Sequence, residues 1–559
     1  MTENEPIELP PKYYLDYFTF LLAFVQRLYG HILSKSEQNF IFDFGQLSED
    51  AQCLFVRFSN RRGLFFRTNR LKYSEITDIP AALYELEEAH FIEPLTAQHR
   101  AAAEEIVNLF TKDEWLKMIP PTELSLKPLK KPDLVRYLLF YFDFGLLSQQ
   151  INQTETVIKM RFEVEVMMMK FLFFGNRHAD MTEFVVRDLG KINFERFRDD
   201  AYTARFKTRQ EAEDKLMVSL TSEQFFELQQ ETTPPEDIFN WFMNWQSSLL
   251  HELSDAAQAG YVRLVNRVGA YLERQKLFEQ ALTVYELTQQ APARERRVRL
   301  LHRLGLTDEA RALCEAIAQD PQNADERFFA LDFQAKLDNA KSRVKKRVTQ
   351  FLQDSETVVI SPQNRYRVEQ GVADYFIEQG RHAVHSENYP WRGLFGLVFW
   401  DIIYEENGQA LHHPLQRTPS DFYQPGFFAK HETQLRQRLA ELTTSQAYSQ
   451  HIESVFIEKY GMANVLVDWH EVLLELTLLI VSRLTPHQLE EILMEMAKNL
   501  RQHTRGFADL LVWDDLYFEL IEVKSPTDHL SAQQLHWMQF MQNLGVGARV
   551  LRVEWAKEV

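Results

Sequence analysis

The stretch Ala508-Asp-Leu-Leu-Val-Trp-Asp-Asp-Leu-Tyr-Phe-Glu-Leu-Ile-Glu-Val-Lys524 decides the fold of the C-terminal part of the chain. Two largely apolar runs, 508–513 and 516–524, flank the turn pair Asp514-Asp515. Runs of this length and composition on either side of a turn predict two paired β-strands.

A helix and a third strand follow this hairpin. Ser531-Ala-Gln-Gln534 has the spacing of a capping box, so a helix is expected to begin there. Gly545 has the position of a residue that ends a helix, and 549–553 reads as a strand. The order strand, strand, helix, strand predicts an α/β domain.

Three side chains of the hairpin indicate chemistry. Glu522 and Lys524 are two residues apart and therefore leave the same face of their strand, and the paired strand can bring Asp509 alongside. Two converging carboxylates suit Mg²⁺ or Mn²⁺, and a neighbouring lysine can orient water or stabilise charge on a phosphate. The alternative is a surface hairpin with an ordinary salt bridge, but the placement of Asp509 favours catalysis.

The whole chain is long and acidic. It has 559 residues, with 62 Lys and Arg against 80 Asp and Glu, which gives a formal net charge of -18. At roughly 150 residues per domain, this length predicts three or four domains. With 45% apolar residues, a disordered chain is excluded. Its 2 cysteines fit a reducing compartment and cannot build a disulfide framework.

The segment 57–72 reverses the acidic balance. It contains six cations and no acid, which is the pattern of a phosphate-binding surface, with a solvated loop as the alternative. The candidate DNA contacts are Arg57, Arg61, Arg62, Arg67, Arg70 and Lys72.

Two further regions are helical. Thr111 and Glu114 predict a capped helix, and the helix–loop–helix that it begins resembles a SAP module, in which Lys127, Lys130 and Lys131 would face phosphates. A plain helical hairpin is the alternative. Residues 245–355 are almost continuously amphipathic, and two segments superpose at an offset of 29 residues, like degenerate tetratricopeptide-like pairs that offer grooves to protein partners.

The C-terminal segment resembles the VRR-NUC branch of the PD-(D/E)XK nucleases. The resemblance rests on Asp509, on Glu522-Val-Lys524 and on the run that follows as far as Trp537. Upstream, Glu387-Asn-Tyr-Pro-Trp-Arg-Gly and Leu47-Ser-Glu-Asp-Ala-Gln are similar to the Fanconi-associated nuclease family, as is Tyr13-Tyr-Leu-Asp-Tyr-Phe. The similarity runs through most of the chain in one order.

This resemblance implies a metal-dependent, structure-selective DNA nuclease. It implies cleavage near 5′ flaps and branched DNA, degradation from a 5′ end, and a role in repair of interstrand crosslinks, with Mg²⁺ or Mn²⁺ as cofactor. Asp509, Glu522 and Lys524 match the catalytic set, Glu387 and the Val523 carbonyl match further metal ligands, and Gln416 matches an active-site glutamine.

Two departures from the family pattern are visible. Ala508 replaces the proline before the aspartate, which affects backbone direction more than the carboxylate. The 2 cysteines cannot form the ubiquitin-binding finger of animal members, so the chain resembles a bacterial type. Arg501, His503 and Arg505, just before the first strand, are expected to hold phosphate oxygens, or else form a charged linker.

We therefore expect a multidomain, mostly α protein that ends in an α/β restriction-endonuclease-like domain. Neither a signal peptide nor an apolar run of the ~18 residues that a membrane span needs is visible, so the expected location is the bacterial cytoplasm, at the nucleoid. Two alternatives remain, a Holliday-junction resolvase and a non-catalytic repair scaffold. The expected domains are an N-terminal DNA-binding domain (1–105), a SAP-like module (106–175), a helical repeat region (176–372) and a VRR-NUC nuclease domain (373–559).

Overall fold

The computed structural model describes residues 9–119, 126–190, 192–195, 202–338, 345–404, 411–424 and 426–556. Contacts between Cα atoms divide the chain into two compact units. Unit 1 comprises Met1–Lys191 and Ala204–Ala212, and unit 2 comprises Ile192–Thr203 and Glu213–Val559. Each unit has its own core and is described by itself.

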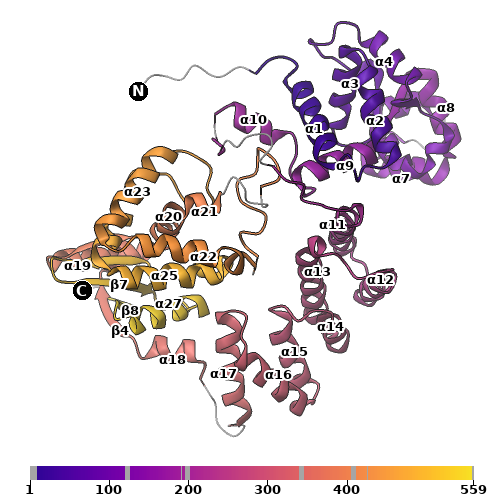
Figure 1. Cartoon of the computed structure of the whole chain (residues 1–559). Helices are drawn as coiled ribbons and strands as arrows, with labels where there is room; N and C mark the ends of the chain where they lie inside the picture. Colours follow the sequence, from indigo (N-terminus) through magenta and orange to yellow (C-terminus); the bar gives the residue numbers. More distant parts are fainter. Residues whose placement is uncertain are drawn as a thin grey trace. The chain divides into compact units, whose positions relative to one another are not determined.

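Unit 1 is a set of helices with one small antiparallel sheet (Figure 1). The sheet has the order β1-β3-β2. Its elements are α1 (Tyr13–Tyr29), α2 (Lys35–Gln46), α3 (Glu49–Ser59), β1 (Phe65–Arg67), α4 (Ile79–Glu88), β2 (Ile92–Pro94), α5 (Ala103–Asn108), α6 (Lys112–Met118), α7 (Lys131–Tyr141), α8 (Phe144–Thr154), β3 (Val157–Met160), α9 (Glu163–Phe174) and α10 (Thr182–Asp188).

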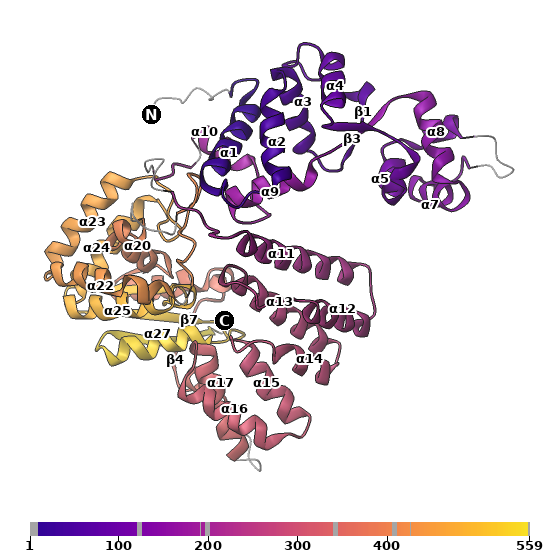
Figure 2. The same ribbon diagram turned by 45° about the vertical axis from the view of Figure 1, so that its right-hand side comes forward.

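Unit 2 begins with stacked helices. Figure 2 shows α13 to α17 following one another, and each helix contacts the next along the chain. Ala281 on α14 and Ala310 on α16, which the offset of 29 residues superposes, are both fully buried. The helices are α11 (Arg209–Gln230), α12 (Pro235–Ser247), α13 (Asp255–Arg274), α14 (Phe278–Tyr285), α15 (Ala293–Arg303), α16 (Thr307–Gln319), α17 (Ala324–Asp338) and α18 (Arg347–Gln353).

A mixed sheet with the order β4-β8-β7-β6-β5 forms the C-terminal part of unit 2. β8 is parallel to β4 and β7, whereas β6 is antiparallel to β5 and β7. The elements are β4 (Glu356–Ile360), α19 (Val368–Glu378), β5 (His382–His385), α20 (Tyr389–Val398), α21 (Trp400–Ile403), α22 (Gly426–Glu441), α23 (Ser445–Lys459), α24 (Glu471–Arg483), α25 (Pro486–Lys498), α26 (Leu500–His503), β6 (Leu510–Trp513), β7 (Phe518–Lys524), α27 (Ala532–Asn543) and β8 (Gly547–Trp555).

Successive side chains of β7 face opposite sides of the sheet, one side being the hydrophobic core and the other the candidate site. Ile521 and Val523 pack in a core cluster with Val372 and Phe376 of α19. Glu522 leaves the opposite face of the strand, where it meets Gln534 of α27. A strand between two helical layers therefore carries a carboxylate on its second buried face.

The expected fold class is confirmed, with one shift in the hairpin. The predicted strands 508–513 and 516–524 begin later, as β6 and β7. The Asp514 carboxylate accepts a hydrogen bond from Leu516 N–H, and Asp514 N–H donates to the Tyr517 carbonyl, so the turn takes up these residues. The predicted capping boxes of α6 and α27 are both present.

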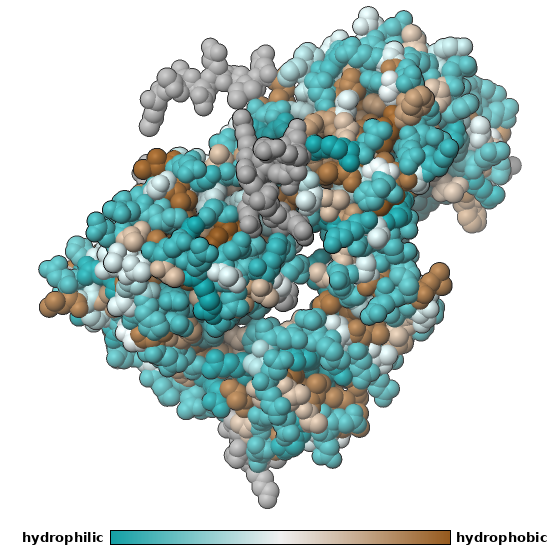
Figure 3. Space-filling view, in the orientation of Figure 1, coloured by the Kyte–Doolittle hydropathy of each residue, from teal (hydrophilic) through white to brown (hydrophobic). Residues whose placement is uncertain are grey.

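The surface is mostly polar. Figure 3 shows hydrophilic residues over most of the visible face, with hydrophobic residues in separate patches. Of the helices in the described residues, none is both long and apolar enough to cross a bilayer.

Candidate active site

Asp509 and Glu522 face each other across the hairpin. The antiparallel register pairs Leu510 with Ile521, so the residue before Leu510 lies opposite the residue after Ile521. Asp509 Oδ2 accepts a hydrogen bond from Val523 N–H at 2.8 Å, which fixes its carboxylate beside β7. The structure thus brings together the two carboxylates that the sequence selects.

Glu522 is fully buried and only partly satisfied. Its Oε1 lies 2.8 Å from Lys524 Nζ and accepts a hydrogen bond from Gln534 Nε2. Its Oε2 is buried and has no hydrogen-bond partner among the described residues. A buried acceptor without a partner is costly, so this oxygen is placed to bind something else.

The electrostatics of the pair indicate a shortage of positive charge. Burial raises the pKa of Glu522, and the facing charge of Asp509 raises it further, against the effect of Lys524. Burial also raises the pKa of Asp509, although the Val523 N–H and Lys524 oppose this. One ammonium does not balance two facing carboxylates, of which Glu522 is fully buried, and a bound cation would.

Glu387 reaches the pair through its backbone. It lies two residues after β5 and has a φ of 42°, in the left-handed region. The N–H groups of Ser386 and Glu387 donate to the Asp509 carbonyl at 2.8 and 3.3 Å. The side chain of Glu387 is 53% exposed and lies 3.4 Å from His385 Nε2. Its predicted role as a metal ligand stays a prediction, because the ligand oxygens of Asp509, Glu522 and Glu387 do not all lie within 4.8 Å of one another.

Glu369 is a nearby acid that the sequence interpretation missed. It lies in the first turn of α19, and its charge raises the pKa of Asp509 further, after burial. No motif marks it, because α19 precedes Asp509 by more than 130 residues. Only the packing of α19 against the sheet brings it near.

Two further predicted residues have defined places. Val523 directs its N–H to Asp509, and the contact of its carbonyl with a metal stays a prediction. The Gln416 side-chain amide accepts from His412 N–H at 2.9 Å and donates to the Thr418 carbonyl at 2.7 Å. These two hydrogen bonds lie within the loop that carries Gln416, and its active-site role stays a prediction.

The residues fit a hard divalent cation. Asp509 and Glu522 offer carboxylate oxygens, one of them buried and without a partner, in a setting that raises their pKa values. Oxygen-only donor sets favour Mg²⁺ and Mn²⁺ over softer metals. This fit rests on the charge and chemistry of the donors.

The three residues before β6 separate in the structure. Arg501 lies with its guanidinium 6.0 Å from the centre of the Tyr423 ring, and the charges of Arg501 and Arg505 both act on that phenol. His503 is instead buried, with Nδ1 2.6 Å from the Glu495 carbonyl. The predicted phosphate contacts stay predictions, and the burial of His503 does not favour its part in them.

Two arginines that the sequence interpretation missed join this region. Burial lowers the pKa of Arg263, and the neighbouring charges of Arg501 and Arg267 lower it further. Arg263 and Arg267 lie on α13, so a repeat helix and the segment before β6 contribute to one cationic cluster. None of Arg263, Arg267, Arg501 and Arg505 has an ion pair within the described parts of the chain.

The basic segment 57–72 in unit 1 is half neutralised. Arg57 pairs with Glu75 at 2.5 Å, and Arg67 pairs with Glu114 at 2.7 Å and with Glu155. Arg70 also reaches Glu114, at 2.9 Å. The remaining cations, which are exposed and have no ion pair in the described ranges, are Arg61, Arg62 and Lys72.

The lysines of the SAP-like segment are exposed at the start of α7. Lys131 Nζ donates to the Asn108 carbonyl at 2.9 Å, near the end of α5. The Lys127 carbonyl accepts from Lys112 Nζ at 2.6 Å, and its own side chain and that of Lys130 point into solvent. DNA contact by these three lysines stays a prediction.

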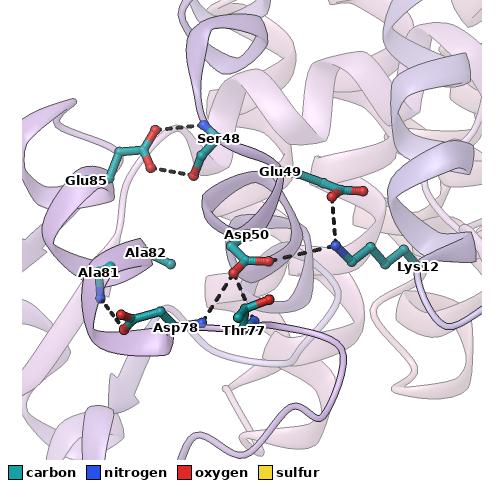
Figure 4. A pocket seen from close by; sticks show the side chains of 9 residues that line it. All are labelled: Lys12, Ser48, Glu49, Asp50, Thr77, Asp78, Ala81, Ala82 and Glu85. Carbon is teal, nitrogen blue, oxygen red and sulfur yellow. Dashed lines mark hydrogen bonds and ion pairs between the residues drawn. The ribbon is translucent and has the colours of Figure 1, made fainter.

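A pocket in unit 1 differs in chemistry from the hairpin site. Figure 4 shows that acids and Lys12 line it, together with the start of α4. Asp50 accepts from Thr77 N–H and Asp78 N–H, Lys12 pairs with Glu49 at 2.8 Å, and Glu85 accepts from Ser48. These acids already have partners, so the pocket is part of the architecture of unit 1.

Comparison with known proteins supports the assignment at both ends of the chain. A family model described as "FAN1, HTH domain" matches residues 12–93, and a model described as "VRR-NUC domain" matches residues 443–555. The Fanconi-associated nuclease 1 homolog of Pseudomonas aeruginosa is 26% identical over 558 residues, 99% of this chain and 97% of that protein. The Arabidopsis thaliana homolog is 24% identical and covers 98% of this chain and 68% of its own length.

Solved structures agree in fold. The crystal structure of paFAN1 bound to 1nt 5′ flap DNA with gap has a TM-score of 0.81 and 25% identity, and covers 98% of this chain and 100% of that one. The paFAN1 complex with 2nt 5′ flap DNA with gap has a TM-score of 0.82, at 24% identity, and covers 99% and 100%.

The α/β fold, with Asp509, Glu522 and Lys524 on its hairpin, defines a VRR-NUC nuclease domain. Nuclease domains of this type generally depend on a divalent metal. Over nearly its whole length the chain is similar to Fanconi-associated nucleases, with the HTH model matched near its start and the VRR-NUC model near its end.

Proposed function

We propose that this protein is a metal-dependent, structure-selective DNA nuclease. It cleaves near 5′ flaps and other branched DNA, degrades DNA from a 5′ end, and acts in the repair of interstrand crosslinks. The observation that carries the proposal is the Asp509–Glu522 pair, in which Glu522 is buried and has one oxygen without a partner among the described residues. The paFAN1 structures, which hold 5′ flap DNA, support the choice of substrate.

Each residue of the site has a role that follows from its place. Asp509 and Glu522 would hold a divalent cation, Mg²⁺ or Mn²⁺, and Glu387 lies two residues after β5, where its N–H contacts the Asp509 carbonyl. The chemistry that such a cation supplies is stabilisation of charge on the phosphate and a lower pKa for water. Lys524, held 2.8 Å from Glu522, places a positive charge where negative charge develops on the phosphodiester.

The cluster of Arg263, Arg267, Arg501 and Arg505 binds the phosphates of the DNA. Arg263 is repelled by Arg267 and Arg501, Arg505 lies near the same Tyr423 ring as Arg501, and phosphate oxygens would relieve the repulsion. Arginines without acidic partners bind polyanions better than those already paired, because no ion pair has to be broken first. In unit 1, the same argument favours Arg61, Arg62, Lys72 and the lysines of the SAP-like segment, Lys127, Lys130 and Lys131. Selectivity then comes from these local patches, since the chain as a whole has a net charge of -18.

The domain organisation supports the same function. We propose that residues 1–105 and the SAP-like module at 106–175 contact duplex DNA, and that the helical repeats of 176–372 set the geometry towards the nuclease domain at 373–559. Grooves between repeat helices offer surfaces to protein partners. The proposed place of action is the bacterial nucleoid.

A substrate map with two matched variants tests the proposal. Labelled flap, nicked, Holliday-junction and single-stranded DNA are incubated with wild type, Asp509→Ala and Asp515→Ala. Asp515 lies in the exposed turn of the same hairpin and controls for the substitution itself. We expect Mg²⁺- or Mn²⁺-dependent flap cleavage by wild type and Asp515→Ala, and DNA binding without cleavage by Asp509→Ala.

Other outcomes would identify the alternatives. Symmetric cleavage of Holliday junctions without flap cleavage would indicate a resolvase. Binding without cleavage of any substrate by wild type would indicate a scaffold. Cleavage by Asp509→Ala at the wild-type rate would contradict the site.

A further inference from the structure

A second cluster of metal-binding side chains lies outside the hairpin site. Glu495 on α25, His503 on α26 and His536 on α27 offer one carboxylate oxygen and two ring nitrogens, all within 4.8 Å of one another. No other group of three His, Cys, Asp or Glu ligand atoms in the described ranges is this close. The three residues come from three helices of the nuclease fold, with β6 and β7 between the second and the third, and all are buried or nearly so.

The spacing of these atoms suits one tetrahedral metal ion. Glu495 Oε1 lies 3.1 Å from His536 Nε2 and 3.6 Å from His503 Nδ1. Ligands that each lie about 2.1 Å from a tetrahedral Zn²⁺ are about 3.4 Å apart. The two observed separations fall on either side of that value.

The orientation of His536 supports the same conclusion. Its Nε2 is buried and close to Glu495 Oε1, but it makes no hydrogen bond with any described residue. The 3.1 Å between this nitrogen and this oxygen is also compatible with two ligands of one metal ion. A ring nitrogen left in this state is otherwise an unsatisfied polar group.

The neighbours of Glu495 leave its Oε1 available to a metal ion. Lys498 Nζ lies 2.9 Å from Glu495 Oε2, so the second carboxylate oxygen is held while Oε1 faces the histidines. His503 Nδ1 donates to the Glu495 carbonyl at 2.6 Å. Metal binding through Nδ1 exchanges this hydrogen bond for a metal bond and moves the ring proton to Nε2.

We propose that Glu495, His503 and His536 form a second metal site, which binds a borderline transition-metal ion such as Zn²⁺. A donor set of two imidazoles and one carboxylate favours Zn²⁺ over Mg²⁺, whereas the oxygen-only Asp509–Glu522 pair has the reverse preference. The site joins α25, α26 and α27, and α27 also carries Gln534, which contacts Glu522. Its role is to stabilise the helices around the nuclease centre.

Metal titration of the full chain tests the proposal. The protein is stripped with a chelator, and binding of Zn²⁺ is followed by calorimetry and by the shift in Tm, without DNA. Co²⁺ is the spectroscopic probe, because its visible absorption reports a tetrahedral nitrogen-containing site. We expect one equivalent of Zn²⁺ to bind wild type, Asp509→Ala and His487→Ala alike, with a rise in Tm.

His536→Ala is expected to weaken Zn²⁺ binding by at least about 100-fold, since loss of an outer partner alone typically weakens it roughly 10- to 100-fold. Lys498→Met is expected to weaken it less, by about 10-fold, because Lys498 contacts only the carboxylate. His487, exposed on the same helix as Glu495, is the matched control. Because Asp509→Ala keeps the site, failure of the proposed nuclease function leaves this result unchanged.

Three outcomes would overturn the proposal. These are no stoichiometric binding of Zn²⁺ to wild type, binding that survives His536→Ala, and binding that Asp509→Ala removes. Each would assign the cluster to hydrogen bonding at the end of α25 or the bound ion to the hairpin site. If His536→Ala proves unstable, His536→Gln, which keeps a polar side chain, gives the same test.

Discussion

The two acidic centres of the nuclease domain respond to burial in opposite ways. Asp509 and Glu522 have raised pKa values, whereas the equally enclosed Glu495 has a lowered one. The difference lies in the neighbours. Glu522 faces a second carboxylate and one ammonium, while Glu495 is surrounded by an ammonium and two imidazoles. The first centre has more negative than positive charge, whereas Lys498 already balances the charge of Glu495 at the second.

We infer from this difference that the hairpin acids serve function and that Glu495 serves stability. An uncompensated buried charge is destabilising until its ligand binds, so its removal should not unfold the protein. A compensated buried charge contributes to stability, and its removal leaves its partners without a counter-charge. Substitution of Glu522 should therefore reduce cleavage without lowering stability. Substitution of Glu495 should lower stability without reducing cleavage.

The largest expected effect is on cleavage. Glu522→Gln keeps the shape of the side chain but removes the charge, and we expect flap cleavage to fall by at least about 1000-fold, because several kcal/mol of charge stabilisation is lost. The Tm of the metal-free variant should equal or exceed that of wild type. Glu554→Gln, at an exposed position on β8, is the control. Wild-type cleavage by Glu522→Gln would remove Glu522 from the site.

The second prediction concerns pH in the metal-free protein. The folded pKa of Glu522 is raised from 4.5 towards about 8, so the folded protein holds a proton that the unfolded chain loses in this window. Stability from this group is present below pH 4.5 and is lost as pH rises towards 8, by up to about 1.4 kcal/mol per pH unit. Chemical unfolding in EDTA across this range measures the effect.

Glu522→Gln should flatten this pH dependence, and Mg²⁺ should offset it in wild type, because the bound ion replaces the proton. Glu495 has the opposite sign. Its folded pKa is about 2, so its contribution is present above pH 4.5 and is lost as pH falls towards 2. An identical pH profile for wild type and Glu522→Gln would show that Glu522 is not held as the structure has it.

The third prediction concerns Glu495, where we expect an effect on stability and none on cleavage. In metal-free buffer, Glu495→Gln should reduce the free energy of unfolding by about 1–3 kcal/mol, since hydrogen bonds to a charged group are lost. Cleavage by the folded variant at 25 °C should stay close to wild type. Glu491→Gln, exposed on the same helix, should change neither. Denaturant unfolding and flap cleavage on the same samples give both values.

The sequence predicted the first centre and missed the second for one physical reason. Asp509, Glu522 and Lys524 lie on one hairpin, and strand pairing alone fixes their approach. His503 and His536 are 33 positions apart and meet only because α26 and α27 pack together. His503 was therefore interpreted from its neighbours in sequence, as a phosphate contact beside two arginines.

The local balance of charge could not be predicted from the sequence either. The run 57–72 appears basic in sequence, but Glu75 just after it, and Glu114 and Glu155 from distant segments, neutralise half of it. Conversely, Arg263 is brought near Arg501 by packing, and no local pattern marks it. The fold class and the hairpin site could be predicted from local patterns, whereas the balance of charge required the tertiary structure.

The smallest expected effect lies at the link between the two centres. Gln534 on α27 donates to Glu522 Oε1, and its own side-chain oxygen accepts from Ser531 N–H in the capping box of α27. Gln534→Leu should reduce cleavage by about 10-fold, because one hydrogen bond to a charged group contributes about 1.5 kcal/mol. Ser531→Ala removes the cap, at a cost of about 1 kcal/mol in stability, but keeps the Gln534 donor. If Ser531→Ala reduces cleavage as much as Gln534→Leu, the effect belongs to the helix end, and Gln534 does not position Glu522.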